Sequence, residues 1–171
     1  MTPFKPLALL LGLALGACQG ATALDADGKK TMTPSTTYLH LLRHTPFFTA
    51  LSTHQLRWVI EHSAEWRAEA GAVIARSTSA PDYWVLLDGG WELVCGERHY
   101  PSGHGAPGKW FNPALAKGQD CALITTTGSY VMRILASDMN AMLASGFAFE
   151  GQLQAGRDFY TLLFDTALEG R

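Results

Sequence analysis

Two groups of histidine and acidic residues have spacings that could hold a metal ion. The first places His40 and His44 four residues apart, on one face of a predicted helix, with His54 in the next segment. The second lies on a short predicted strand and the turn after it, and contains Glu97, His99 and His104. Neither group supplies three ligands from a single well-defined helix or strand, and no His-Glu-x-x-His motif occurs. The spacings therefore favour surface or partly packed histidines over a metal site.

Two further patterns would indicate catalysis or cofactor binding in the right context. Ser102 and His104 are close in the sequence, but this does not produce the geometry of a catalytic triad, and no Gly-x-Ser-x-Gly elbow is present. Residues 103–108 satisfy the spelling Gly-x-Gly-x-x-Gly, which holds a pyrophosphate only where a helix begins directly after it. Residues 109–113, Lys-Trp-Phe-Asn-Pro, do not open a helix of any length, so a loop is predicted. We therefore expect a protein that is not an enzyme and that uses no metal or cofactor.

The first cysteine follows a segment with the pattern of a secretion signal. One basic side chain, Lys5, precedes an uncharged apolar run over residues 7–17, which is half the length of the ~20 residues that span a membrane. The run ends Leu-Gly-Ala-Cys at Cys18 and resembles the bacterial lipobox. That resemblance implies cleavage before Cys18 and acylation, by chains such as palmitate, of its sulfur and its new amine, which together anchor stably. A plain secreted protein and an uncleaved anchor are the alternatives.

The residues after Cys18 predict a location and a tether. Residue 19 is glutamine and not aspartate, which in lipoproteins resembling those of enteric bacteria points to the outer membrane. Residues 19–37 are mostly small and polar, without helical or strand periodicity, and predict a flexible tether with a mean reach of roughly 25 Å. The expected organisation is a signal peptide, a lipidated cysteine with its tether, and a folded domain facing the periplasm, at residues 1–17, 18–37 and 38–171.

The two remaining cysteines form an even pair in a compartment that permits disulfides. Cys95 and Cys121 both fall at the ends of predicted strands, so a bridge between them is feasible. Closing a loop of about 25 residues would stabilise the fold by ~3 kcal/mol. The alternative is two separate buried thiols, and the sequence does not decide between the disulfide and the free thiols.

The composition indicates one packed domain. The 171 residues are 47% hydrophobic and 16% charged, which is typical of a chain that builds a core and not of a disordered one. Thirteen lysines and arginines stand against fifteen aspartates and glutamates, a net charge of −2. Such a chain lacks the basic field that binds a nucleic-acid backbone, so no nucleic-acid partner is expected.

Short elements separated by turn signals must position these residues. Helical periodicity and capping residues predict helices at 38–44, after an N-cap at Ser52, from an N-cap at Ser137 to about Ser145, and at 149–168. Runs rich in aromatic and β-branched residues predict strands at 65–70, 73–76, 83–87, 91–95, 97–100, 121–126 and 130–135. This pattern indicates an α+β fold that is mainly a β jelly roll or β-roll, with short N-terminal helices and a C-terminal helix.

The order of several segments resembles a cyclic-nucleotide-binding domain. Residues 42–52 (LRHTPFFTALS), Leu56 and residues 71–74 (GAVI) are similar to the opening of that family, a Leu-rich turn, Pro-x-Phe, Leu-Ser, a helix and Gly-x-x-Ile. Residues 83–94 (YWVLLDGGWELV) resemble its next hairpin, and residues 130–139 (YVMRILASDM) its last strand and the start of the following helix. The resemblance covers about residues 38–150, and an unrelated jelly roll is the alternative.

The phosphate-binding cassette of that family is degenerate in this chain. The resemblance implies a Gly-Glu pair, whose Gly region offers backbone N–H groups to the phosphate, and an Arg about ten residues later. Asn112 stands at the Gly, Pro113 at the Glu and Asp120 at the Arg. Pro113 has no N–H, and Asp120 replaces attraction with repulsion, forfeiting an ionic hydrogen bond worth roughly 1.5–3 kcal/mol. The candidate degenerate ligand pocket comprises Trp110, Phe111, Asn112, Pro113, Asp120, Cys121 and Ala122.

Several residues around this cassette have two interpretations. Lys117 could supply a substitute cation, although a solvated lysine is the interpretation we favour. Trp110 and Phe111 could line an apolar pocket or a partner surface, or could be core. The other tryptophans are expected mostly in the core by their positions in helices and strands, and are Trp58, Trp66, Trp84 and Trp91.

Two classes of function compete. The first is a lipid-anchored, non-catalytic module that binds an envelope protein through its β-roll and C-terminal helix. The second is a sensor whose altered pocket accepts an uncharged or cationic small molecule or, with less support, a cyclic nucleotide. The secretion signal, and the chain's end at Arg171 where regulators of this family carry a helix-turn-helix, argue against transcription regulation. The resemblance also implies dimerisation through the closing helix, although Gly151 and Gly156 weaken that helix, and the oligomeric state stays open.

Overall fold

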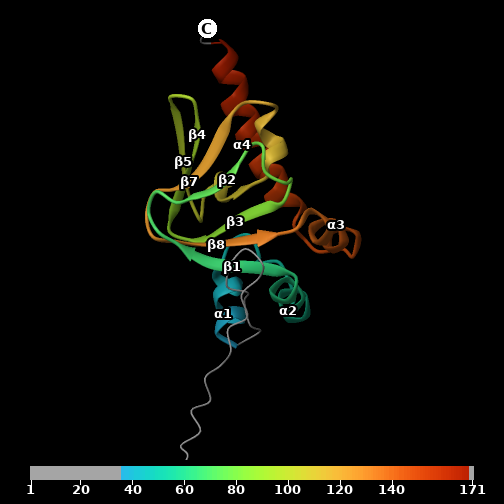
Figure 1. Ribbon diagram of the computed structural model, residues 1–171. Coiled ribbons are helices and arrows are strands. Elements are labelled where there is room, and N and C mark those ends of the chain that lie inside the picture. The colour runs from blue at the N-terminus through green and yellow to red at the C-terminus, as the bar shows by residue number, and fades with distance from the viewer. Residues whose placement is uncertain (1–35, 170–171) are drawn as a thin grey trace, which may run out of the picture.

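The structure, a computed structural model, describes residues 36–169 (Figure 1). These residues form the helices α1 (Thr36–His44), α2 (Thr53–Glu61), α3 (Ala136–Ala144) and α4 (Glu150–Glu169). The strands are β1 (Ser63–Ala68), β2 (Val73–Arg76), β3 (Tyr83–Asp88), β4 (Gly90–Cys95), β5 (Arg98–Gly103), β6 (Trp110–Phe111), β7 (Cys121–Thr125) and β8 (Ser129–Ile134). Two short 3₁₀ helices, η1 (Pro107–Lys109) and η2 (Pro113–Ala116), lie before and after β6.

The strands form two four-stranded antiparallel sheets, in the orders β1-β8-β3-β6 and β2-β7-β4-β5. Between them lies one hydrophobic cluster, to which Leu86 of β3, Leu93 of β4 and Leu123 of β7 contribute. Val85 and Leu87 of β3 belong instead to a second cluster, which the helices cover. Because successive side chains of a strand point to opposite faces, β3 is buried on both. The prediction of an α+β β-roll with flanking helices is confirmed.

The two N-terminal helices lie side by side at one end of the roll (Figure 1). The predicted N-cap of α2 is confirmed as part of a capping box: Gln55 N–H donates to Ser52 Oγ (3.3 Å), and Ser52 N–H donates to Gln55 Oε1 (3.0 Å). Helix α1 begins at Thr36 and therefore includes the last two residues that we assigned to the tether.

The start of α3 differs from the prediction. Ser137 is not the N-cap, because the helix already begins at Ala136. Asp82, from the loop before β3, accepts a hydrogen bond from Ala136 N–H at 3.1 Å and so performs the capping from 54 positions away. Its other carboxylate oxygen accepts from Arg133 Nε at 2.8 Å. Local sequence rules cannot find a cap that a distant loop supplies.

Two strands differ from the prediction. Strand β5 continues through Pro101 to Gly103, which a proline tolerates because β5 is an edge strand. Strand β6, only two residues long, was not predicted as a strand, and it pairs Trp110 with Val85 and Phe111 with Trp84 of β3. A two-residue strand is too short for any periodic signal.

Helix α4 runs along the side of the roll and packs against η1, β6 and η2 (Figure 1). Its buried positions recur at helical spacing and are Leu153, Gly156, Tyr160 and Phe164. Leu162, on the opposite face, is 66% exposed. The helix therefore covers the segment in which the degenerate cassette lies.

The signal peptide, Cys18 and residues 19–35 of the tether lie outside the described residues. Within residues 36–169, no helix combines the length and the apolar character that crossing a membrane requires.

Candidate functional site

The loop between β6 and β7 carries the degenerate cassette, and Asn112 holds it in place. Asn112 is 8% exposed and stands as the N-cap of η2. Its Nδ2 donates to the carbonyl of Pro81 at 2.7 Å, and its Oδ1 accepts from Ala114 N–H at 2.9 Å. Both polar atoms of the amide are thus used within the protein, so the residue at the family's Gly position has a structural role.

The backbone donors at the start of this loop are already paired. Pro113, buried at the first position of η2, has no N–H. Ala114 N–H donates to Asn112 Oδ1, and Leu115 N–H donates to the Asn112 carbonyl at 2.9 Å. A phosphate that approached this segment would have to displace these hydrogen bonds. The segment therefore does not offer the free N–H groups that an anion site needs.

The two charged residues of the loop face solvent. Asp120, at the family's Arg position, is exposed. Lys117 lies at the C-terminal end of η2 with a positive φ of 49°, and its Nζ is 4.0 Å from a carboxylate oxygen of Asp165 on α4. Both side chains of that pair are more than half exposed, so the pair contributes little. Lys117 is thus a solvated lysine, and no cation from it points into the roll.

Trp110 is the main contact between the loop and α4. Its indole Nε1–H donates to the carbonyl of Gln152 at 2.9 Å, and its ring stacks on Tyr83 with 5.7 Å between ring centroids. On α4, Gly156 lies against the indole so closely that a Cβ at this position would overlap the ring. Gly156 therefore allows α4 to approach the roll closely. The sequence had suggested only that this glycine weakens the helix.

A second contact between α4 and the roll centres on Gly108 of η1. The Gly108 carbonyl accepts a hydrogen bond from Trp91 Nε1–H at 2.9 Å. The Tyr160 hydroxyl donates to the Trp110 carbonyl at 3.0 Å and lies 3.3 Å from the Gly108 carbonyl oxygen. Burial raises the pKa of the Tyr160 phenol, which therefore stays protonated as a donor. Next to Gly108, Lys109 is 5% exposed, and burial lowers the pKa of its ammonium group.

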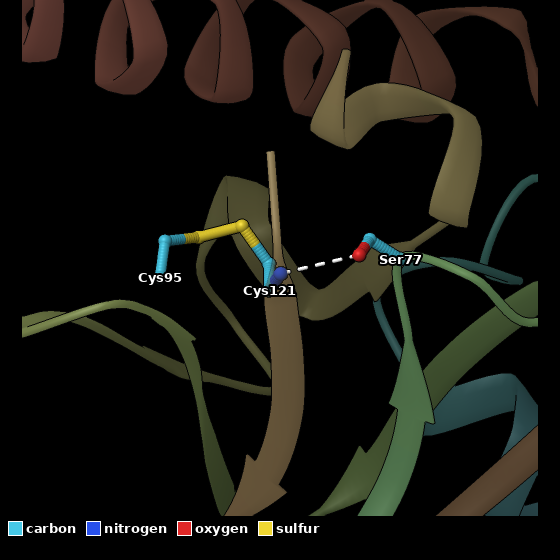
Figure 2. The surroundings of a disulfide bond; sticks show 3 residues. All are labelled: Ser77, Cys95 and Cys121. Atoms are coloured by element: carbon cyan, nitrogen blue, oxygen red, sulfur yellow. Dashed lines mark hydrogen bonds between the residues drawn. A yellow bond between two sulfur atoms is a disulfide. The ribbon is translucent and has the colours of Figure 1, made fainter. Parts of the chain in front are cut away.

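A disulfide joins Cys95 of β4 to Cys121 of β7 beside this loop (Figure 2). The two residues are paired across the sheet, with 4.3 Å between their Cα atoms. On the other side of Cys121, its N–H donates to Ser77 Oγ at 3.2 Å, and Ser77 N–H donates to the Cys121 carbonyl at 2.8 Å. Of the two alternatives left open by the sequence, the structure has the bridge and not two separate thiols.

The structure does not bring the predicted pocket residues together as the wall of an open pocket. Trp110 and Phe111 are 1% and 0% exposed, so of the two interpretations that the sequence left open, the structure has them in the core. Ala122 is half-buried on β7 and pairs with Val94. The residues that close this region and that sequence reasoning missed are Gly108, Gln152 and Gly156. The sequence signal for this closure was a pair of glycines in the predicted C-terminal helix. One of them, Gly156, marks the place where the helix lies close to Trp110.

The histidine groups stay apart from any metal-binding geometry. His40 and His44 are in contact, with 4.4 Å between ring centroids, and both are exposed. His99 Nδ1 lies 3.0 Å from Glu92 Oε2. Among the described residues, no three His, Cys, Asp or Glu side chains gather closely enough to hold a metal ion. Residues 103–108 end β5 and lead into η1, which is too short to supply the helix N-terminus that a dinucleotide needs.

Open hollows lie outside the roll, among the helices. Two of them, of about 470 and 440 Å³, share Phe147 and together run from α2 past α3 to the start of α4. We call this the helical groove, and its apolar residues are Trp58, Met142, Leu143, Phe147 and Leu153. A third hollow, of about 390 Å³, lies between α2, β1, β8 and α3, and Ser63 and Arg133 line it.

Comparison with solved structures shows the same fold in cyclic-nucleotide-binding domains. A structure of PKAR CBD2 with Sp-2Cl-cAMPS bound has a TM-score of 0.59 and 14% identity, over 77% of this chain and 89% of that one. A structure of cAMP-bound PfPKA-R (141-441) has a TM-score of 0.61 and 14% identity, over 77% of this chain and 46% of that one. A protein from Geobacter metallireducens GS-15, named for cyclic nucleotide binding, has a TM-score of 0.53 and 25% identity, over 72% of this chain and 95% of that one.

The sequence itself has no such match. No protein-family model and no curated protein matches it. The resemblance inferred from the order of segments is therefore supported at the level of the β-roll fold. In chemical terms, the region at the cassette position is a hydrogen-bonded junction between the roll and α4, in which the N–H groups of Ala114 and Leu115 are paired within the loop.

Proposed function

We propose that this protein is a lipid-anchored, non-catalytic module of the cell envelope that binds a partner protein. Anchoring through Cys18 to the outer membrane, with the domain facing the periplasm, is part of this proposal and is supported by the signal-like segment before that cysteine. The β-roll supplies the scaffold, and the partner binds outside it.

The observation that carries the proposal is the pairing of the cassette's donors. Asn112 uses both atoms of its side-chain amide, the Tyr160 hydroxyl lies on the backbone of β6, and Gly156 seats α4 directly on Trp110. A ligand in the roll would have to break these contacts and lift α4. Binding of a cyclic nucleotide in the family's usual manner is therefore disfavoured, although the fold is shared.

The helical groove is the surface that best fits a partner protein. Its half-buried apolar side chains are Trp58, Leu143 and Phe147, while Met142 and Leu153 are buried beneath it. The rings of Trp58 and Phe147 meet edge to face with 5.7 Å between centroids. Apolar grooves between helices with a polar rim are a common site for an amphipathic helix. Here His54 and Gln55 lie on one side, and Glu150 and Arg157 on the other.

Affinity purification from detergent-solubilised envelope tests this function. The wild-type chain is expected to retain a stoichiometric protein, which Ala148→Arg, in the wall of the groove, loses. Ala155→Arg is the matched control, because Ala155 is also exposed but lies on α4 away from the groove walls. Equal capture by both variants would place the partner elsewhere. Calorimetry of the full-length chain in detergent should detect no micromolar binding of cyclic AMP or cyclic GMP, and such binding would contradict the proposal.

A small-molecule sensor is the second candidate, and one observation favours it. In the third hollow, the Ser63 hydroxyl is buried and has no hydrogen-bond partner among the described residues. Glu61 and Asp138 also line this hollow, and the guanidinium of Arg133, which lines it too, is paired with Asp82 at 2.8 Å. The two carboxylates suit a cationic ligand with a hydrogen-bonding group. Thermal-shift screening with small amines, comparing wild type with Ser63→Ala, separates the candidates: a stabilising amine that depends on Ser63, without a captured protein, favours the sensor.

A further inference from the structure

Histidines and arginines gather on the exposed side of the two N-terminal helices. On α1, His40, Arg43 and His44 have the spacing of one helical face, and all three side chains are exposed. On α2, His54 and Arg57 are also exposed and three residues apart. We call this set the basic face, comprising His40, Arg43, His44, His54 and Arg57.

One hydrogen bond joins the two halves of the basic face. The guanidinium of Arg43 donates to the hydroxyl of Thr53, the first residue of α2. The next residue, His54, therefore lies beside the end of α1 that carries Arg43 and His44. The C-terminal end of α1 and the N-terminal end of α2 therefore meet at this hydrogen bond.

The charge of this surface depends on its histidines. Residues 36–62 contain two arginines and one glutamate, a net charge of +1 with neutral histidines. That glutamate, Glu61, is seven residues from His54 and thus about 10 Å away along the axis of α2. The α3 side chains that share a hollow with His54 are uncharged. Residues 36–62 contain four histidines, of which His62 is half-buried with its ring stacked on Trp58. Each of the other three, His40, His44 and His54, adds one positive charge when it is protonated, which would take the net charge from +1 to +4.

The basic face lies at the end of the domain that is nearest to the proposed anchor. Seventeen residues, 19–35, connect Cys18 to the start of α1, and they contain two lysines and two aspartates. A coil of this length has a mean reach of roughly 20–25 Å. His99 and His104, by contrast, lie in and just after β5, the edge strand of the sheet β2-β7-β4-β5.

We propose that the basic face docks on anionic phospholipid headgroups of the membrane that holds the anchor, and does so more tightly as the pH falls. This inference rests on the lipid anchor of the proposed function. The anchor supplies proximity, and the face supplies orientation, because arginine and protonated histidine pair with headgroup phosphates.

Titration of individual histidines tests the docking within one sample. The full-length chain is placed in nanodiscs of phosphatidylcholine alone or with phosphatidylglycerol, and imidazole NMR signals are followed against pH. Single His→Gln variants assign the signals. An anionic surface at about −30 mV concentrates protons about threefold, which moves a titration midpoint up by about half a pH unit. His40, His44 and His54 are expected to show this shift, while His99 and His104 do not.

The outcomes separate the docking from the anchor. A chain that co-elutes with the discs but shows no shift, or shows an equal shift of the three basic-face histidines and of His99 and His104, would overturn the docking and leave the anchor intact. A chain that does not co-elute would overturn both, and mass spectrometry of the N-terminal peptide then identifies whether Cys18 is acylated. Arg57→Glu should remove at least half of the shift, whereas the control Arg76→Glu, exposed at the end of β2, should keep it.

Discussion

The loop between β6 and β7 and the basic face of α1 and α2 use polar side chains in opposite ways. In the loop, Asn112 is buried and bonded to the backbone of the protein, and so is Tyr160 of α4, which packs over the loop. On the basic face, His40 and Arg57 are exposed, and the charge that they present is available to an outside partner. The position at which the family binds its ligand has become part of the scaffold, while the surface that suits an interaction lies on the N-terminal helices. Variants in the first region should therefore change stability, and variants in the second should not.

The disulfide is expected to have the largest effect on the loop side of this comparison. Reduction of the Cys95–Cys121 bridge, whose cysteines are 26 positions apart, should lower the free energy of unfolding by about 3 kcal/mol. Urea denaturation with and without reductant measures the change, and a Cys95→Ala, Cys121→Ala double variant provides the control that reductant should not affect. Alkylation of both thiols in the native, unreduced protein would show that no bridge exists.

The two glycines of α4 give a matched pair. Gly156→Ala should destabilise the protein by about 2–3 kcal/mol, because the new methyl group overlaps the Trp110 indole and forces α4 away from the roll. Gly151→Ala has open space around it and should instead stabilise the helix by about 0.5–1 kcal/mol. Chemical denaturation of both variants decides the matter. Similar effects of the two substitutions would mean that α4 is not seated on Trp110.

Asn112→Asp tests whether the loop residue is structural. The substitution keeps an acceptor for Ala114 N–H but sets a buried carboxylate oxygen against the Pro81 carbonyl, in place of a donor at 2.7 Å. A loss of about 2 kcal/mol in unfolding free energy is expected. Asn140→Asp, exposed on α3, is the control and should change stability by less than about 0.5 kcal/mol. An unchanged stability in Asn112→Asp would indicate that the loop is free to receive a ligand.

Tyr160→Phe should cost about 1 kcal/mol near neutral pH, because it removes the hydroxyl donor to the Trp110 carbonyl. The wild-type protein also has a pH dependence here, since the folded-state pKa of Tyr160 is raised. The stability that the protonated Tyr160 hydroxyl contributes is fully present below about pH 10. It is lost as the pH rises further, at up to about 1.4 kcal/mol per pH unit. Denaturation between pH 9 and 11.5 should show a shallower decline in Tyr160→Phe. Burial lowers the pKa of Lys109, so this residue makes the stability rise with pH, opposite to the effect of Tyr160, in both the wild type and Tyr160→Phe.

The smallest effects are expected on the basic face. His40→Gln, His44→Gln and His54→Gln should each change the unfolding free energy by no more than about 0.5 kcal/mol, because these side chains are exposed. The same variants should nevertheless lose their titration signals in the nanodisc experiment. A destabilisation of 2 kcal/mol or so would show that the histidines belong to the scaffold, and would remove the contrast between the two regions.

Much of the fold was readable from local patterns. Ser52 marked the start of α2 because a capping box acts within four residues, and alternating or apolar runs marked the strands around Leu86 and Leu123. The cap of α3 and the strand β6 were missed. Asp82 reaches α3 across 54 positions, and β6 has two residues, so neither leaves a periodic or local signal.

The candidate site was predicted in part. Substitution of the cassette residues by Asn112, Pro113 and Asp120 could be read directly, because an absent cation and an absent N–H are properties of residue types. The burial of Trp110 beneath α4 could not be predicted from the sequence, because its neighbours Gln152 and Gly156 are more than 40 positions away.

The sequence by itself determined the class of the fold. It also predicted that the cassette lacks phosphate-binding residue types and that a signal segment precedes a lipidation site at Cys18. Residue type and short-range spacing are enough for those conclusions. Only the tertiary structure decided that α4 closes over the loop, that Cys95 pairs with Cys121, and that Arg43 of α1 bonds to Thr53 of α2. These features depend on which distant segments pack together, and packing over long separations is set by the whole core and not by any one stretch of the chain.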